Sequence, residues 1–216
     1  MTQLQPSLSG LSRSSPRHPF LSPTLARKLL SRHKTSTQKG EIDQTISFLT
    51  ELILFYPLLT KPPHSITLQA FYHLANALIM RSKSSNQPED AISAVKYLSH
   101  LRDQPREISN PPRHQFTTSL VNALAVQVEL EAGDVKENIR QMVILCHEYV
   151  TSGLNTSDHD ATHLIRLISG IVVPKIHMLD PDQALDKVIE CLQAARKHRP
   201  DLFEAQIGRA SCRERV

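Results

Sequence analysis

An internal repeat constrains the fold of this chain more than any other feature of its sequence. The segments "HLANALIM" at 73–80 and "SLVNALAV" at 119–126 share the frame Leu-x-Asn-Ala-Leu, at an offset of 46 residues. Self-similarity at a fixed period of this length is typical of chains in which small structural units stack on one another. The sequence therefore predicts repeated units rather than one or two independent globular domains.

A second set of similar segments follows the first. "DQTISFLTEL", "EDAISAVKYL" and "KENIRQMVIL" place Ile46, Ile92 and Ile139 at intervals of 46 and 47 residues, and Val188 is a looser fourth member. Apolar residues recur three and six positions after each isoleucine, which predicts one stripe of an amphipathic helix. These residues are Leu49 and Leu52, Val95 and Leu98, and Met142 and Leu145. Each stripe requires a neighbouring helix to cover it.

Glycine and proline separate these segments where helices are expected to begin and end. Proline is tolerated only in the first turn of a helix, so Pro88 and Pro181 mark starts, whereas Pro174 should kink or interrupt its helix. The predicted helix pairs are 22–35 with 41–56, 65–83 with 88–102, 113–132 with 135–150, and 158–179 with 182–198. The predicted fold class is all-α, an α-solenoid of antiparallel helix pairs with a period of about 46 residues.

The chain divides into three parts. We interpret residues 1–20 as a disordered, basic leader rich in Ser and Pro, and residues 21–205 as about four helix pairs of a truncated array. The final "IGRASCRERV" resembles the translation of a common sequencing adapter, so residues 206–216 are interpreted as an artefact of that origin. On this hypothesis the native protein continues beyond Ala205.

Charge and composition exclude several classes of partner. The full sequence has 25 Lys and Arg against 21 Asp and Glu, and without the tail these counts become 22 and 20, a net charge near +2. The chain has no basic stripe interleaved with aromatic residues, so we predict no nucleic-acid partner. The most apolar run, "ISFLTELILFYPLL", is too short for a membrane span and contains Glu51 and Pro57. The glycines form no phosphate-binding loop, and no cofactor is predicted.

Two short motifs contain residue types that can carry chemistry. "HDATH" places His159 and His163 four residues apart, a spacing that can bind zinc, but the surrounding "NTSDHD" favours the start of a helix with Ser157 or Asp158 as its cap. Cys146 lies beside His147, yet adjacent helical residues point about 100° apart and cannot act as nucleophile and base. We predict a core position for Cys146, no metal site, and no enzymatic activity.

The cysteine content favours a reducing compartment. Without the tail only Cys146 and Cys191 remain, which is no framework for disulfides, and the predicted location is cytoplasmic. The first 40 residues contain no Asp or Glu and seven Lys or Arg, so a mitochondrial transit peptide is the alternative.

The frame Leu74-Ala75-xx-Leu78, followed by Ala91-xxx-Val95-xx-Leu98, resembles a tetratricopeptide repeat. The period of about 46 departs from that family's usual length of about 34 residues. The stretch from about 17 to 205 more specifically resembles the repeat regions of large proteins from mushroom-forming fungi. In those proteins such arrays often precede a CHAT domain, a caspase-like peptidase module, which this chain does not contain.

The resemblance implies a binding groove lined by the first helix of each pair. It places Gln69, Tyr72, Asn76, Ile79 and Met80 in that groove, followed by Gln115, Thr118, Asn122 and Ala125. Asn76 and Asn122 occupy a position that grips a peptide carboxylate in some relatives, but Tyr72 and Thr118 stand where that clamp needs Lys or Arg. The alternative is that both asparagines form hydrogen bonds between adjacent repeats.

Two hypotheses on function follow. The first is a non-catalytic scaffold for protein–protein interaction, a fragment of a larger repeat protein that binds a protein or peptide and can self-associate through its truncated end. The second is the regulatory or sensor region of a CHAT-type protease whose catalytic domain is missing from this chain.

Overall fold

The computed structural model describes residues 39–55, 65–103, 113–151, 158–179 and 186–193. The principal helices are α3 (Lys39–Phe55), α4 (Ser65–Ser85), α5 (Pro88–Arg102), α6 (Arg113–Glu129), α7 (Val135–Thr151) and α8 (Asp158–Leu167). Residues 186–193 are also helical, and these described ranges contain no strand, so the all-α prediction is confirmed for them. The leader at 1–20, the predicted helix at 22–35 and the tail at 206–216 lie outside the described residues.

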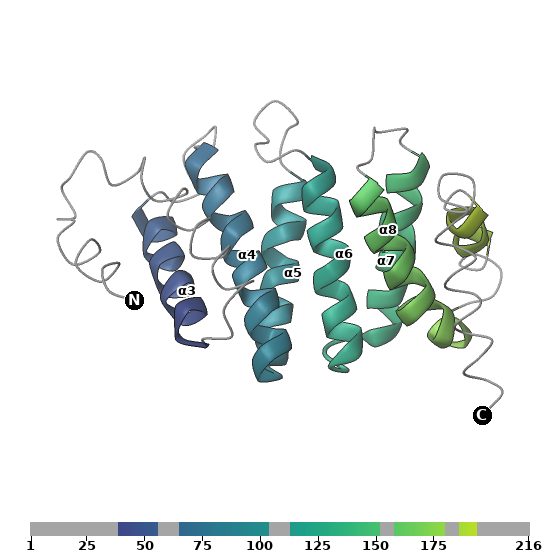
Figure 1. Cartoon of the computed structure of the whole chain (residues 1–216), viewed down its shortest axis with the longest axis horizontal. Helices are drawn as coiled ribbons and strands as arrows, with labels where there is room; N and C mark the ends of the chain where they lie inside the picture. The colour runs from purple at the N-terminus through teal and green to yellow at the C-terminus, as the bar shows by residue number, and fades with distance from the viewer. Residues whose placement is uncertain (1–38, 56–64, 104–112, 152–157, 180–185, 194–216) are drawn as a thin grey trace.

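Consecutive helices pack side by side. From α3 to α7 each helix contacts the next one along the chain, and Figure 1 shows them following one another across the molecule in chain order. Short connections, Asn86 and Gln87 after α4 and residues 130–134 after α6, make the joined helices antiparallel. Helix α6 also contacts α4 and α8, so the first helices of successive predicted pairs touch one another directly.

The buried face of α4 recurs in α6, 46 residues later. Residues that are buried at both members of the pair are Leu74 and Leu120, Ala75 and Val121, Ala77 and Ala123, and Leu78 and Leu124. Residues that are half-buried at both are Gln69 and Gln115, Tyr72 and Thr118, and Asn76 and Asn122. The two helices therefore use the same face for the core and present the same remaining face to the surface.

The second helices repeat with a different offset from the one predicted. The core-facing residues of α5 are Ala91, Ala94, Leu98 and Leu101, and their buried counterparts in α7, 48 residues later, are Ile139, Met142, Cys146 and Tyr149. Ile92 is 41% exposed, so the alignment of Ile92 with Ile139 was wrong by one residue. Small alanines face the core in α5, where they allow close approach of its neighbours but carry a weak hydrophobic signal in the sequence.

One arginine joins three helices. The guanidinium of Arg81 in α4 donates through Nε and Nη2 to the two carboxylate oxygens of Asp90 in α5, at 2.6 and 2.8 Å. Its Nη1 donates to Asp43 Oδ1 in α3 at 2.9 Å. These hydrogen bonds, above all those with Asp90, raise the pKa of Arg81 above its ordinary value. The ion pair holds the first turn of α5 against α4, so that Asp90 and Ala91 face inward and Ile92 faces outward.

Helix α6 ends three residues earlier than predicted, in a Schellman motif. The N–H of Ala132 donates to Gln127 O at 2.8 Å and the N–H of Glu131 donates to Val128 O at 3.4 Å, which is the hydrogen-bond pattern of that motif. Glu131 has φ +53°, in the left-handed region, where a side chain is unfavourable. Gly133 follows in the same turn with φ +69°, which glycine adopts without a steric cost because it has no Cβ.

Glu131 and Gly133 both have positive φ angles, and we expect substitutions at these two positions to have opposite effects on stability. Glu131→Gly should raise the free energy of unfolding by about 0.5–1 kcal/mol, because glycine adopts the left-handed conformation without a steric cost. Gly133→Ala should lower the free energy of unfolding by about 1 kcal/mol for the opposite reason. Urea denaturation of the two variants tests both. A loss of stability in Glu131→Gly would contradict this account of the turn.

The helix that begins with α8 changes its geometry before Pro174, as the sequence predicted. The α-helical part ends at Leu167, a π-helical turn covers Ile168–Val172, and a 3-10 helix covers Val173–Met178. Pro174 has no N–H to donate and its ring clashes with the preceding turn, so a regular α-helix cannot continue through it. The π-helical turn packs in the core through Ile168 and Val172, whereas the 3-10 helix has no buried residue.

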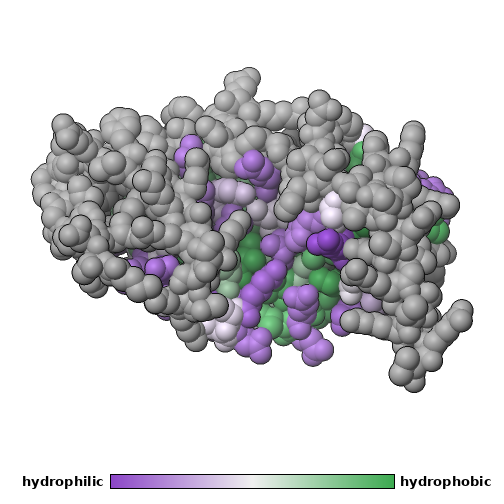
Figure 2. Space-filling model, in the orientation of Figure 1, coloured by the Kyte–Doolittle hydropathy of each residue, from purple (hydrophilic) through white to green (hydrophobic). Residues whose placement is uncertain are grey.

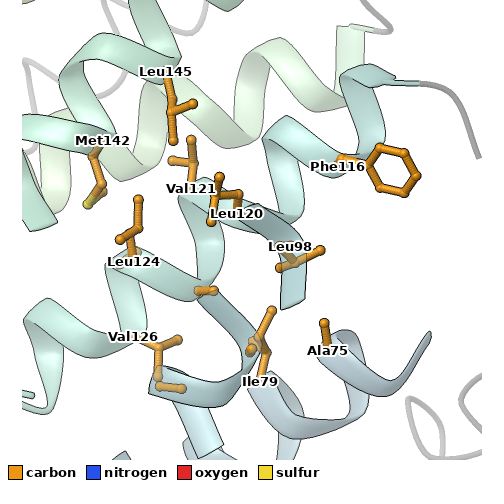
Figure 3. Packing of buried hydrophobic residues seen from close by; sticks show 14 of the residues in the cluster. Ala75, Ile79, Leu98, Phe116, Leu120, Val121, Leu124, Val126, Met142 and Leu145 are labelled. Atoms are coloured by element: carbon orange, nitrogen blue, oxygen red, sulfur yellow. The ribbon is translucent and has the colours of Figure 1, made fainter. Parts of the chain in front are cut away.

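The core runs through all of these helices as one cluster of buried side chains. Figure 3 shows Val121 and Leu124 of α6 pointing toward Met142 and Leu145 of α7, with Ile79 of α4 and Leu98 of α5 nearby. Leu98, Leu124 and Met142 are each 0% exposed. Helix α6 therefore has core contacts with the pair before it and with its own partner.

Candidate functional site

The predicted groove residues separate into a surface set and a core set. Ile79 and Ala125 are only 2% and 1% exposed, so these two side chains belong to the core and contribute to no surface. Each lies one turn after another buried residue, Ala75 and Val121 respectively, and extends the same buried stripe. The other seven are half-buried, and we call them the first-helix face: Gln69, Tyr72, Asn76 and Met80 of α4, and Gln115, Thr118 and Asn122 of α6.

Hydrogen bonds between α4 and α6 hold part of the first-helix face in position. Asn76 donates from Nδ2 to the backbone oxygen of Tyr72 at 2.8 Å, and its Oδ1 accepts from Ser119 Oγ at 3.2 Å. Ser119 Oγ also lies 3.4 Å from the hydroxyl of Tyr72. The Tyr72 ring meets Phe116 edge to face, with 5.4 Å between ring centroids. Tyr72 and Asn76 are thus held in fixed positions by the neighbouring helix.

Asn122 makes a second link between the same two helices. Lys83, in the last turn of α4, donates from Nζ to Asn122 Oδ1 at 3.1 Å, and its own side chain is exposed. Both asparagines of the Leu-x-Asn-Ala-Leu frame therefore bond across the boundary between successive pairs. This geometry favours the structural alternative for these two residues over a clamp for a carboxylate.

Sequence reasoning missed Ser119 and Lys83 as partners of this face. Ser119 is the first residue of "SLVNALAV" and lies outside the shared frame Leu-x-Asn-Ala-Leu. Lys83 is the last residue of the helix predicted over 65–83, whereas α4 continues to Ser85. The signal that could have found Lys83 is its position seven residues after Asn76, on the same side of a continued helix.

The described part of this surface mixes polar and apolar groups. Figure 2 shows hydrophilic and hydrophobic residues interspersed over the region of α4 to α6. The first-helix face supplies side-chain amides at Gln69 and Gln115, a hydroxyl at Thr118 and a thioether at Met80. These groups can donate and accept hydrogen bonds with a polypeptide and can pack against its apolar side chains. The set contains no nucleophile paired with a base.

Only one histidine of the candidate zinc pair has its side chain within the described residues. His163 lies half-buried in α8, and the side chain of His159 is outside the described set. The described residues contain no cluster of three or more His, Cys, Asp or Glu side chains arranged to hold a metal ion.

Cys146 lies in the core, as predicted. It is 0% exposed, and Cys191 on the helical residues 186–193 is 1% exposed. Burial raises the pKa of the Cys146 thiol far above its ordinary value, with a further contribution from Cys191, and burial also raises the pKa of Cys191 to about 12. His147 points elsewhere, with Nε2 at 2.6 Å from Glu190 Oε2. Cys146 and His147 therefore form no catalytic pair.

Burial and raised pKa together predict inert thiols. Because the thiolate is the reactive form, Cys146 and Cys191 should resist alkylation by iodoacetamide in the folded protein at pH 8. In denaturant, both should react at the rate of an exposed cysteine. Mass spectrometry of the digested protein assigns the modification to each cysteine separately. Rapid alkylation of Cys146 under native conditions would contradict its core position.

Comparison with protein-family models, with curated proteins and with solved structures gave no match. Among the described helices, none combines the length and apolarity that a membrane span needs.

Proposed function

We propose that this chain is a non-catalytic binding scaffold and that the first-helix face is where a protein or peptide partner docks. The observation that carries the proposal is the repetition of half-buried polar residues at one offset. Gln69, Tyr72 and Asn76 recur as Gln115, Thr118 and Asn122, while the residues on the opposite side of both helices are buried. A surface whose polar positions repeat along stacked helices suits an extended partner that meets each repeat in turn.

The arrangement we infer is an α-solenoid of antiparallel pairs with a repeat of about 46 residues. It is supported by the direct contact of α4 with α6 and of α6 with α8, which stack the first helices in one row. It is also supported by the shared burial of Leu74, Ala77 and Leu78 with Leu120, Ala123 and Leu124. In such an array each pair covers the apolar face of the next, and the row of first helices is left open to a ligand.

Within the first-helix face, Tyr72 and Asn76 have structural roles that limit their use in a test of binding. Asn76 and Tyr72 are committed to the contact with Ser119, so their replacement would disturb the packing of α4 on α6. Gln115 and Thr118 are half-buried and lie on α6, in the middle of the described helices. Substitution at these two positions probes the proposed docking surface without removing the contacts of Tyr72 and Asn76 with Ser119.

Site-specific photo-crosslinking tests the proposal. A photoreactive phenylalanine derivative is placed at Gln115 or Thr118 in the full chain, expressed in cells of the source organism, and irradiated. Matched controls carry it at Lys96 of α5 or Gln44 of α3, which are exposed and outside the first-helix face. We expect discrete protein adducts from the two α6 positions and none from the controls.

A purified partner then provides the quantitative test. Gln115→Arg should weaken its binding at least tenfold, about 1.4 kcal/mol, because a long charged side chain replaces an amide in the contact. Lys96→Glu should leave the Kd unchanged. Circular dichroism checks that both variants are folded. Equal crosslinking from both sets of positions, or a Kd insensitive to Gln115→Arg, would refute the first-helix face as the docking surface.

A further inference from the structure

We draw no further inference here: the strongest candidate, the hydrogen-bonded Lys83 and Asn122 side chains between α4 and α6, belongs to the surface already described, and nothing in the structure shows what covers it.

Discussion

Leu98→Ala should lower the free energy of unfolding by about 2–5 kcal/mol, the range observed when a fully buried leucine is truncated. Leu98 is 0% exposed and lies in the core-facing stripe of α5 with Ala94 and Leu101. Because the core-facing residues that precede Leu98 in α5 are Ala91 and Ala94, few other large side chains on this helix can fill the space left behind. The loss of stability is measured by urea denaturation followed by circular dichroism at 222 nm.

Ile92→Ala in the same helix is the matched control. Ile92 is 41% exposed, so its truncation should change the free energy of unfolding by no more than about 0.5 kcal/mol. The sequence pattern placed Ile92 and Leu98 on one buried stripe, whereas the structure separates them. Similar losses at both positions would show that α5 is rotated relative to the described packing.

Asp90→Ala is expected to have the second largest effect, a loss of about 2–3 kcal/mol. The side chain of Asp90 is 11% exposed and accepts two hydrogen bonds from Arg81, whose own side chain is 24% exposed. Removing the carboxylate leaves the guanidinium between α4 and α5 without its nearest counter-charge. The expected loss lies below the 3–5 kcal/mol of a fully buried pair, because Asp43 and water still contact Arg81.

Asp43→Ala tests whether burial decides the size of this effect. Asp43 accepts from the same arginine at 2.9 Å, but its side chain is 52% exposed. An exposed ion pair contributes about 0–1 kcal/mol, and that contribution falls as salt is added. Denaturation of both variants in low salt and in 1 M NaCl distinguishes an exposed ion pair, which salt weakens, from a more buried one. If Asp43→Ala costs as much as Asp90→Ala, the bidentate contact does not organise the start of α5.

The sequence predicted the class of structure and most helix ends because those depend on strong local signals. Pro88 begins α5, and Pro174 ends regular α-helical geometry, since proline lacks an N–H wherever it occurs. The frame with Leu74 and Leu120 has the same burial in both helices. The orientation of α5 about its own axis, which turns Ile92 outward, was not predictable in this way. It depends on Asp90, whose charge makes it an unlikely inward-facing residue until its partner Arg81 is seen.

The candidate surface was predicted in outline and not in detail. Seven of its nine residues are half-buried, because side chains three and four apart on a helix share a face. Ile79 and Ala125 are in the core because α4 and α6 are covered on two sides, by their own partner helices and by each other. The pattern of apolar residues along one helix does not show that a second neighbouring helix also covers it. The Lys83 bond to Asn122 was missed for the same reason, since it joins residues of different repeats.

The side-by-side packing of consecutive helices also sets how this chain should fold. From α3 to α7 the largest helix contacts join neighbours along the chain, which favours a low contact order. Chains with low contact order have little loop-closure entropy to overcome and fold quickly. The α4–α5 segment has the most extensive packing between two described helices, so its amides should be the last to exchange with solvent deuterium. Folding is then expected to start in that segment and to spread outward one helix at a time, in the manner of a one-dimensional chain of coupled units.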